Sequence, residues 1–256
     1  MFKNKNDKPL GEVVYGLHPI IELLKAKKRK LVALYTCKPE PKGFKAIEQL
    51  LPNHVSVTYL QRDALAKFAG TTDHQSVVAL ATPFVYRKKF FEPKQHKALL
   101  MLDSIQDVRN LGAMLRSAYC TGVTGVIITQ KHSASISAAA LKASAGLAEH
   151  LDIYLAPSAQ SAVLQLKQAG YHLYITSFKG ESALKAAYKD PLCIVIGGEG
   201  TGVTPSIMKE GTQVTIPQHT SEISYNASVA AGIMLFIVSQ RHSPGRSNAS
   251  IEPGNL

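Results

Sequence analysis

The most constraining feature of this sequence is residues 192–238, where short apolar runs alternate with glycine-rich and small polar turns. A buried strand is predicted from Leu192 to Ile196, and Gly197 to Gly202 follow it directly. A second strand is predicted from Gln213 to Ile216, and an apolar helix from Ala227 to Val238. Two strand ends and one helix start can bring several backbone amides and carbonyls together, which is how a protein holds a polar small molecule.

The preceding residues also alternate between apolar runs of strand length and helical patterns. Strands are predicted at 13–15, 31–36, 55–60, 76–81, 98–103, 125–129, 153–155 and 171–176. Helices are predicted at 17–27, 43–51, 63–69, 111–121, 133–147, 158–169 and 183–189. The alternation predicts an α/β fold, in which a small α/β layer precedes a mostly parallel sheet covered on both faces.

The alternation breaks between residues 83 and 97, where basic residues surround two phenylalanines and a proline. We predict a domain boundary there. The expected parts are a disordered N-terminus (1–11), a first domain (12–83), a basic linker (84–97), a second domain (98–241) and a disordered tail (242–256).

The net charge of +11 is concentrated in the first part of the chain. Residues 1–97 contain 18 lysines and arginines against 8 acidic residues, whereas residues 98–256 contain 11 against 10. This asymmetry favours a first domain that binds a polyanion, and the alternative is a solvated lysine-rich face without a partner. The candidate contacts are Lys27, Lys28, Arg29 and Lys30, and in the linker Arg87, Lys88 and Lys89.

Several classes of protein are disfavoured. No apolar run approaches the roughly 18 to 20 residues of a membrane span, and the lysine-rich start lacks the pattern of a signal peptide. We therefore expect a cytoplasmic protein. Cys37, Cys120 and Cys193 are far apart in apolar contexts, which favours buried structural thiols over disulfides. The histidines show no metal-ligand spacing, and we predict no metal.

Polar residues near helix starts give the first candidate segment, Leu102 to Gly112, with Arg116 farther along the same helix. Asn110 is a candidate N-cap. Arg116 lies on an otherwise apolar helix, so it is either a surface residue with a packed stem or a buried guanidinium that binds phosphate.

The glycine loop is the second segment, and Glu199 is its single charge. No Lys-Ser/Thr follows it, which excludes a P-loop. Its place near the C-terminus also fits poorly with the dinucleotide loop of an NAD-dependent oxidoreductase. The third segment joins Ile216-Pro217 to Ser224-Tyr225-Asn226, where Ser224 or Asn226 could bind a ligand or cap the next helix.

Together and in this order, the three segments resemble the motifs of the SpoU (TrmH-like) branch of the SPOUT superfamily, the S-adenosylmethionine-dependent RNA 2′-O-ribose methyltransferases. The matching stretches are 107–113 with 116–118, then 196–202, then 216–217 with 224–230, and the Ser/Ala-rich stretch 133–149 lies between the first two. The first domain resembles the family's substrate-binding extension through 15–19 and 74–78. Val108 replaces a common proline and Tyr225 a usual leucine.

The resemblance implies a second domain with a deep trefoil knot, a homodimer, and S-adenosylmethionine as cofactor. It places the cofactor against Gly197, Gly198, Gly200, Ile216, Tyr225 and Ala227. It also implies that Arg116 is the catalytic arginine, with Asn110, Glu199, Ser224 and Asn226 orienting it and the ribose. A guanidinium stays protonated, so we favour Arg116 as a group that binds phosphate and stabilises a developing alkoxide over its acting as a base.

The expected substrate is ribosomal RNA, that of the large subunit, held by the basic first domain. Transfer RNA is the alternative substrate. The alternative class is a catalytically silent RNA-binding or ribosome-assembly protein on the same fold, which would have no use for the cofactor pocket.

Overall fold

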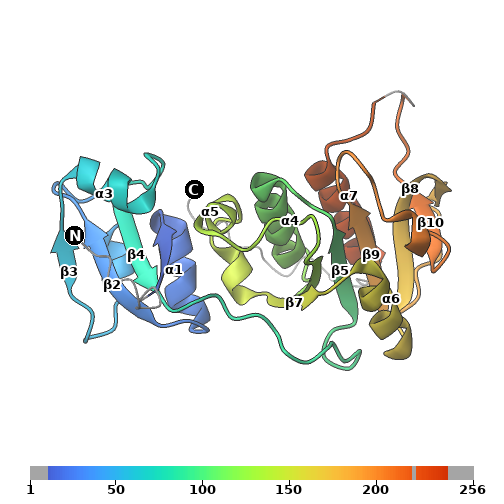
Figure 1. The fold of residues 1–256 in the computed structure, drawn as a ribbon, viewed down its shortest axis with the longest axis horizontal. Helices are drawn as coiled ribbons and strands as arrows, with labels where there is room; N and C mark the ends of the chain where they lie inside the picture. Colours follow the sequence, from blue (N-terminus) through green and yellow to red (C-terminus); the bar gives the residue numbers. More distant parts are fainter. Residues whose placement is uncertain (1–10, 221–222, 242–256) are drawn as a thin grey trace.

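The computed structural model describes residues 11–220 and 223–241, which form two sheets joined by residues 82–97 (Figure 1). The predictions of disorder at 1–11 and 242–256 fall, apart from Gly11, outside the described residues. Among the helices that are described, none is long and apolar enough to cross a membrane.

The first domain is a four-stranded sheet in the order β1-β4-β2-β3, in which only β2 and β3 are parallel. Its strands are β1 (Glu12–Tyr15), β2 (Leu31–Thr36), β3 (Val57–Tyr59) and β4 (Val77–Ala81). Its helices are α1 (Leu17–Ala26), α2 (Lys45–Glu48) and α3 (Arg62–Ala69). The main helix, α1, buries Ile20, Leu23 and Leu24, the apolar face that its three-to-four residue spacing predicts.

The second domain is a six-stranded sheet in the order β10-β8-β9-β5-β6-β7, and every pairing in it is parallel. Its strands are β5 (Ala98–Asp103), β6 (Gly125–Thr129), β7 (Asp152–Ala156), β8 (His172–Ser182), β9 (Leu192–Gly197) and β10 (Thr212–Thr215). Its helices are α4 (Val108–Cys120), α5 (Ala138–Ala143), α6 (Ala159–Gln168) and α7 (Ala227–Arg241), with 3₁₀ turns η1 (Leu147–His150) and η2 (Pro205–Ile207). The predicted α/β fold with a parallel sheet is confirmed, whereas the knot stays a prediction.

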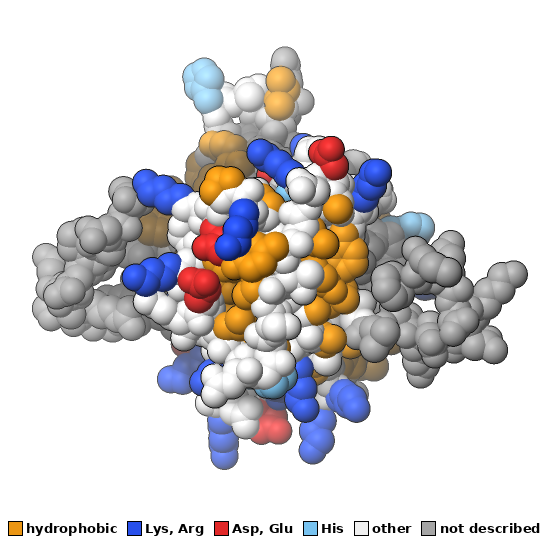
Figure 2. Space-filling model, turned by 90° about the vertical axis from the view of Figure 1, so that its left-hand side faces the viewer, with side chains coloured by type: hydrophobic (Ala, Val, Ile, Leu, Met, Phe, Trp, Pro, Cys, Tyr) orange, Lys and Arg blue, Asp and Glu red, His pale blue; other side chains and the backbone are white. Residues whose placement is uncertain are grey.

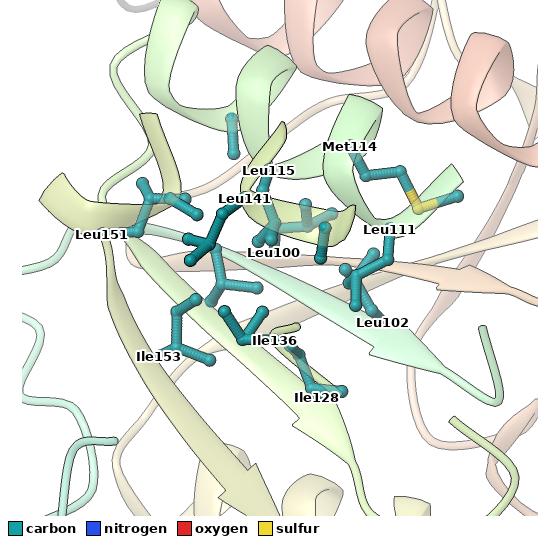
Figure 3. Close-up of a cluster of buried hydrophobic side chains, with 14 of the residues drawn as sticks. Leu100, Leu102, Leu111, Met114, Leu115, Ile128, Ile136, Leu141, Leu151 and Ile153 are labelled. Carbon is teal, nitrogen blue, oxygen red and sulfur yellow. The ribbon is translucent and has the colours of Figure 1, made fainter. Parts of the chain in front are cut away.

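Both faces of this sheet are covered, as predicted. Leu100 and Leu102 of β5 lie in the cluster beneath α4 and α5, where Figure 3 shows them against Leu111 and Leu115. The alternate residues Leu99 and Met101 lie in the opposite cluster with α6. Successive side chains of a strand point to opposite faces, so a strand buried on both sides is continuously apolar. Burying each such side chain contributes about 1.5–3 kcal/mol.

The prediction of a helix at 183–189 is wrong. β8 continues to Ser182, because its last residues pair with β10 after a register shift, and a turn follows. Tyrosine hydroxyls bind the turn's backbone groups: Tyr174 Oη donates to Ala187 O (2.9 Å) and Tyr188 Oη to Ala183 O (3.1 Å). These bonds satisfy carbonyls that a helix would otherwise pair internally. The helix predicted at 133–147 is also shorter, limited to α5 and the separate turn η1.

The segment predicted as a linker is packed against the second domain. The Arg87 N–H donates to Ile153 O (2.7 Å), and Phe91 is buried. The cysteine prediction is correct for Cys193, where burial raises the pKa of the thiol far above its usual value. It is wrong for Cys120, which lies on the exposed side of α4.

We expect His96 to make folding weaker in acid. Its ring is 8% exposed, and burial lowers its pKa below the usual 6.5 although Asp152 lies 3.5 Å away. The unfolded chain therefore takes up this proton more readily, so the stability that neutral His96 provides is present above about pH 6.5 and lost as the pH falls. His96→Asn should flatten the decline in unfolding free energy between about pH 7 and about pH 5, measured by urea denaturation. An unchanged decline would contradict this role.

Candidate active site

The middle of β8, the carboxyl ends of β9 and β10 and the start of α7 surround a pocket of about 440 Å³. This volume is within the range of small-molecule sites, roughly 300–1,000 Å³. The structure brings into it all six predicted cofactor residues, together with Glu199 and Ser224. The six are Gly197, Gly198, Gly200, Ile216, Tyr225 and Ala227. Contact of these residues with a cofactor stays a prediction.

A second hollow of about 280 Å³ adjoins this pocket. It is lined on one side by the β5–α4 turn, from Ser104 to Asp107 and at Asn110, and on the other by residues 198–201 and Ala227. Residues 198–201 and Ala227 line the pocket as well, so the glycine loop with Glu199 lies between the two spaces.

Three of the predicted polar residues form one hydrogen-bonded cluster at that boundary. Asn110 Nδ2 donates to Glu199 Oε1 (2.7 Å), and Asn226 Nδ2 donates to the same oxygen. Asn226 Nδ2 also lies 3.2 Å from Asn110 Oδ1. Two amides from different helices therefore fix one oxygen of the Glu199 carboxylate, while Oε2 has no hydrogen bond to any described residue.

Helix capping differs at the two helix starts. Asn226 does cap α7, since its Oδ1 accepts from the N–H groups of Ser228 (2.9 Å) and Val229 (3.3 Å). Asn110 does not cap α4, and that prediction is wrong: Asp107 accepts from the N–H groups of Arg109 (2.6 Å) and Asn110 (3.4 Å). Because α4 begins earlier than predicted, Asn110 lies in its first turn and its side chain is free to bind Glu199.

The glycine loop folds back on itself. The Gly202 N–H donates to Gly198 O (2.9 Å), and Gly202 has a left-handed backbone with φ +63°. A Cβ on Gly197 would overlap the Gly202 backbone, and one on Gly198 would overlap Ser104 O. The protein's own backbone therefore requires glycine at 197 and 198, whereas at Gly200 a Cβ would meet open space.

Sequence reasoning missed Asp103, the last residue of β5. Its side chain is buried, and it accepts hydrogen bonds from the Thr204 N–H (2.8 Å) and the Ser104 hydroxyl (3.2 Å). The carboxylate thus anchors the far end of the glycine loop to the neighbouring strand. An acidic residue directly after a run of buried apolar residues is the signal that could have identified it.

Arg116 is not part of the pocket in its own chain. It lies on the exposed side of α4 and lines neither hollow. It also makes no hydrogen bond or ion pair with the described residues. Close by in sequence, Tyr119 is 39% exposed, and on α7 Val229 and Phe236 are 48% and 59% exposed. These side chains give α4 and α7 an exposed apolar surface.

The predicted basic contacts divide into two groups. Lys27, Lys30, Lys88 and Lys89 are exposed, and Figure 2 shows lysine and arginine side chains around the edge of the first domain. Arg29 is a correction: its side chain is fully buried against Glu149 and Glu12, so it cannot contact RNA in this structure. Lys28 and Arg87 both bind Asp152. No potential metal site of three His, Cys, Asp or Glu side chains occurs among the described residues.

Comparison with known proteins gives a family match for both domains of the chain. The family model of the SpoU rRNA methylase family matches residues 97–236, and that of the RNA 2′-O ribose methyltransferase substrate-binding domain matches residues 13–87. A 23S rRNA (guanosine-2′-O-)-methyltransferase RlmB from Acinetobacter baylyi is 32% identical, over 88% of this chain and 95% of the relative. An uncharacterized tRNA/rRNA methyltransferase from Mycobacterium avium is 29% identical, over 90% and 77%.

Solved structures share the fold. An AdoMet-bound rRNA methyltransferase from Sinorhizobium meliloti superposes with a TM-score of 0.76 at 21% identity, covering 91% of this chain and 87% of that one. The SpoU methyltransferase AviRb from Streptomyces viridochromogenes, in complex with AdoMet, also gives a TM-score of 0.76 at 21% identity, covering 91% of each chain.

Two alanine substitutions test the packing of the glycine loop. Gly198→Ala should destabilise the protein by about 1–3 kcal/mol, because the added methyl group must displace the Ser104 carbonyl. Gly200→Ala is the matched control, with open space for the same methyl group, and its unfolding free energy should stay close to wild type. Urea denaturation measures both, and equal losses would contradict the packing argument.

Proposed function

Since this chain belongs to the SpoU rRNA methylase family, we infer that it is an S-adenosylmethionine-dependent enzyme that methylates a ribose 2′-hydroxyl in ribosomal RNA. The observation that carries this inference is the Glu199 carboxylate, held by Asn110 and Asn226 between two adjoining hollows. The arrangement suits a reaction between two bound molecules that must meet at one point.

The larger pocket fits S-adenosylmethionine by its chemistry. Among the described residues, Glu199 is the single charged one that lines it, and a carboxylate complements the positive charge of a sulfonium. The loop backbone and Tyr225 supply polar groups and an aromatic surface for the remainder. When bound, S-adenosylmethionine supplies an electrophilic methyl group. Relatives of the same fold are described with this cofactor.

The protein's own residues would prepare the ribose. A 2′-hydroxyl is a poor nucleophile that must lose its proton as it attacks, so a hydrogen-bond acceptor beside it assists. Glu199 Oε2 is available for that bond, because the two asparagine amides occupy Oε1. Arg116 cannot act as a base at neutral pH, and its guanidinium would instead bind the adjacent phosphate and stabilise negative charge on the attacking oxygen.

Arg116 would reach the pocket of a second copy. We propose a homodimer formed through the exposed apolar surface of α4 and α7, with Val229 and Phe236 at its centre. Two observations support it: Arg116 lies three residues before the exposed Tyr119 on α4, and it lines neither of the two hollows described above. The two-fold axis would then give each pocket one arginine from the partner.

The substrate assignment follows the relatives. Those most similar in sequence include enzymes that methylate guanosine in 23S rRNA, so large-subunit ribosomal RNA is the proposed substrate and the cytoplasm the proposed location. Several relatives are named tRNA/rRNA methyltransferases, which keeps transfer RNA as the second candidate. The exposed lysines 27, 30, 88 and 89 would bind RNA phosphates.

Replacement of Arg116 separates binding from chemistry. The wild-type chain should bind S-adenosylmethionine in calorimetry and transfer labelled methyl groups to ribosomal RNA. Arg116→Ala should reduce transfer by about 100-fold or more while cofactor affinity stays near wild type. Absence of cofactor binding by the wild type at millimolar concentration would exclude the enzyme, and methylation of transfer RNA alone would reassign the substrate.

Mixing two inactive variants tests the dimer. If Arg116 acts on the partner's pocket, an equal mixture of Arg116→Ala and Glu199→Gln chains should regain about a quarter of wild-type activity, because half of the dimers then contain one intact site. If Arg116 acts within its own chain, every site in the mixture lacks one group and no activity returns.

Neutralising exposed lysines tests RNA binding. Lys27→Gln with Lys30→Gln should weaken RNA binding and reduce the slope of log affinity against log salt by roughly 0.7–0.9 for each phosphate that the protein no longer neutralises. Lys167→Gln is the control, because that lysine pairs with Glu210 in the second domain (2.6 Å) and should leave the slope unchanged. A slope unaltered by the double substitution would show that these lysines are ordinary solvated surface.

A further inference from the structure

The sequence motifs typical of the substrate-binding extension lie at the junction between the two domains. A Cβ on Gly16, in the first motif, would lie 2.8 Å from Lys142 Nζ of α5. Gln75, in the second motif, accepts a hydrogen bond from the Leu17 N–H (3.2 Å) and so fixes the first residue of α1, next to Gly16. The first motif therefore approaches the second domain directly, and the second motif fixes the start of the helix beside it.

Helix α1 and the residues after it lie lengthwise along residues 142–152, and we name this contact the seam (Figure 1). Near its start, a Cβ on Gly146 would lie 2.7 Å from Pro19 Cα and 3.0 Å from His18 O. Farther along, His150 Nε2 lies 2.8 Å from Glu22 Oε2. The seam thus continues for the whole length of α1.

A buried ion pair closes the seam. Arg29 Nη1 donates to Glu149 Oε1 (2.9 Å), and the two side chains are 0% and 2% exposed. Arg29 Nη2 also donates to Glu12 Oε2 (3.0 Å), and its Nε to Thr82 O (2.7 Å). Burial raises the pKa of the Glu149 carboxyl, and Arg29 opposes that shift. A buried arginine with its donors satisfied on both domains allows one relative orientation, because any tilt would leave a charge unpaired.

Asp152 joins both domains at the end of the seam. Its Oδ1 accepts from Lys28 Nζ (2.8 Å), and Lys28 Nζ also donates to His150 O and Leu151 O. Its Oδ2 accepts from Arg87 Nη1 (3.2 Å). One carboxylate therefore holds together Lys28, which follows α1, and Arg87 of the connecting segment.

The seam rests directly on the helix that carries the candidate active-site residues. Gly112 of α4 packs so closely on α5 that a Cβ there would lie 2.7 Å from Ala140 O and overlap Ala143. α4 carries Asn110 two residues earlier and Arg116 four residues later. A change in the seam therefore changes the distance between the first domain and the pocket.

We propose that Arg29 and Glu149 are positioning residues, which lock the first domain at one angle so that an RNA bound there presents a single nucleotide to the pocket. The proposal rests on the RNA methyltransferase function inferred above. In this arrangement the first domain holds the RNA at a fixed distance and angle from the pocket. Selection of the target nucleotide then depends on the seam as much as on the pocket.

Gly146→Ala tests the seam with a matched control. Gly146 has φ +82°, and a methyl group there would push against Pro19. Gly170→Ala carries the same left-handed backbone penalty, with φ +85°, but its methyl group meets nothing within 4 Å. Relative to Gly170→Ala, Gly146→Ala should show faster hydrogen exchange in residues 16–24 and 142–152. Its kcat/KM on ribosomal RNA should fall by about tenfold or more, with methylation spread to neighbouring nucleotides.

Cofactor affinity distinguishes positioning from damage to the pocket. S-adenosylmethionine should bind both variants within about twofold of wild type, because the pocket is formed wholly by the second domain. Asp152→Asn is the second variant, which loosens the exposed end of the seam without a buried charge and should act in the same direction.

Two results would overturn the proposal. One is faster exchange in the seam with RNA methylation equal in rate and position to that of Gly170→Ala. The other is unchanged exchange and methylation in both seam variants. If the wild type itself binds no S-adenosylmethionine and methylates no RNA, the proposed function fails, and the exchange measurement still reports whether the seam holds the domains together.

Discussion

The side-chain amide of Asn226 holds the candidate site together. Its oxygen caps α7 through the N–H groups of Ser228 and Val229, and its nitrogen binds Glu199 and Asn110. Capping bonds of this kind contribute about 1 kcal/mol, but here the same planar group also fixes the angle of the carboxylate. If α7 started at another residue, Asn226 would move and Glu199 would move with it. The start of the helix and the position of the carboxylate are therefore fixed by the same side chain.

The parallel sheet explains why residues about 100 positions apart meet. β5 and β9 are neighbours in register, with Asp103 opposite Gly197, so the turn before α4 and the glycine loop leave the same edge side by side. Ligand sites in open α/β sheets form at this carboxyl edge. The close fit of Gly198 against Ser104 O and the bond from Thr204 to Asp103 then lock the two turns to each other.

Neighbouring basic side chains in the first domain differ in their burial. Lys27 and Lys30 stay exposed, whereas Arg29 between them is buried in an ion pair with Glu149, which lies 120 residues later. A count of charges along the sequence cannot separate these neighbours, because the difference arises from a partner in the other domain. In this basic cluster, the exposed lysines are available to bind a polyanion, whereas Arg29 connects the two domains.

By itself, the sequence determined the α/β class, the strands and most helices, since apolar periodicity depends on local spacing and needs no partner. It also indicated which glycine loop, asparagines and glutamate form the candidate site, because residue type and order carry the family's motifs. Only the tertiary structure decided which hydrogen bonds and ion pairs those residues form. In the structure Asp107, not Asn110, caps α4, residues 183–189 form a turn and irregular chain after β8, and Arg29 is buried. Each of these depends on a hydrogen bond or ion pair whose two ends the fold brings together, and no local pattern contains that distance.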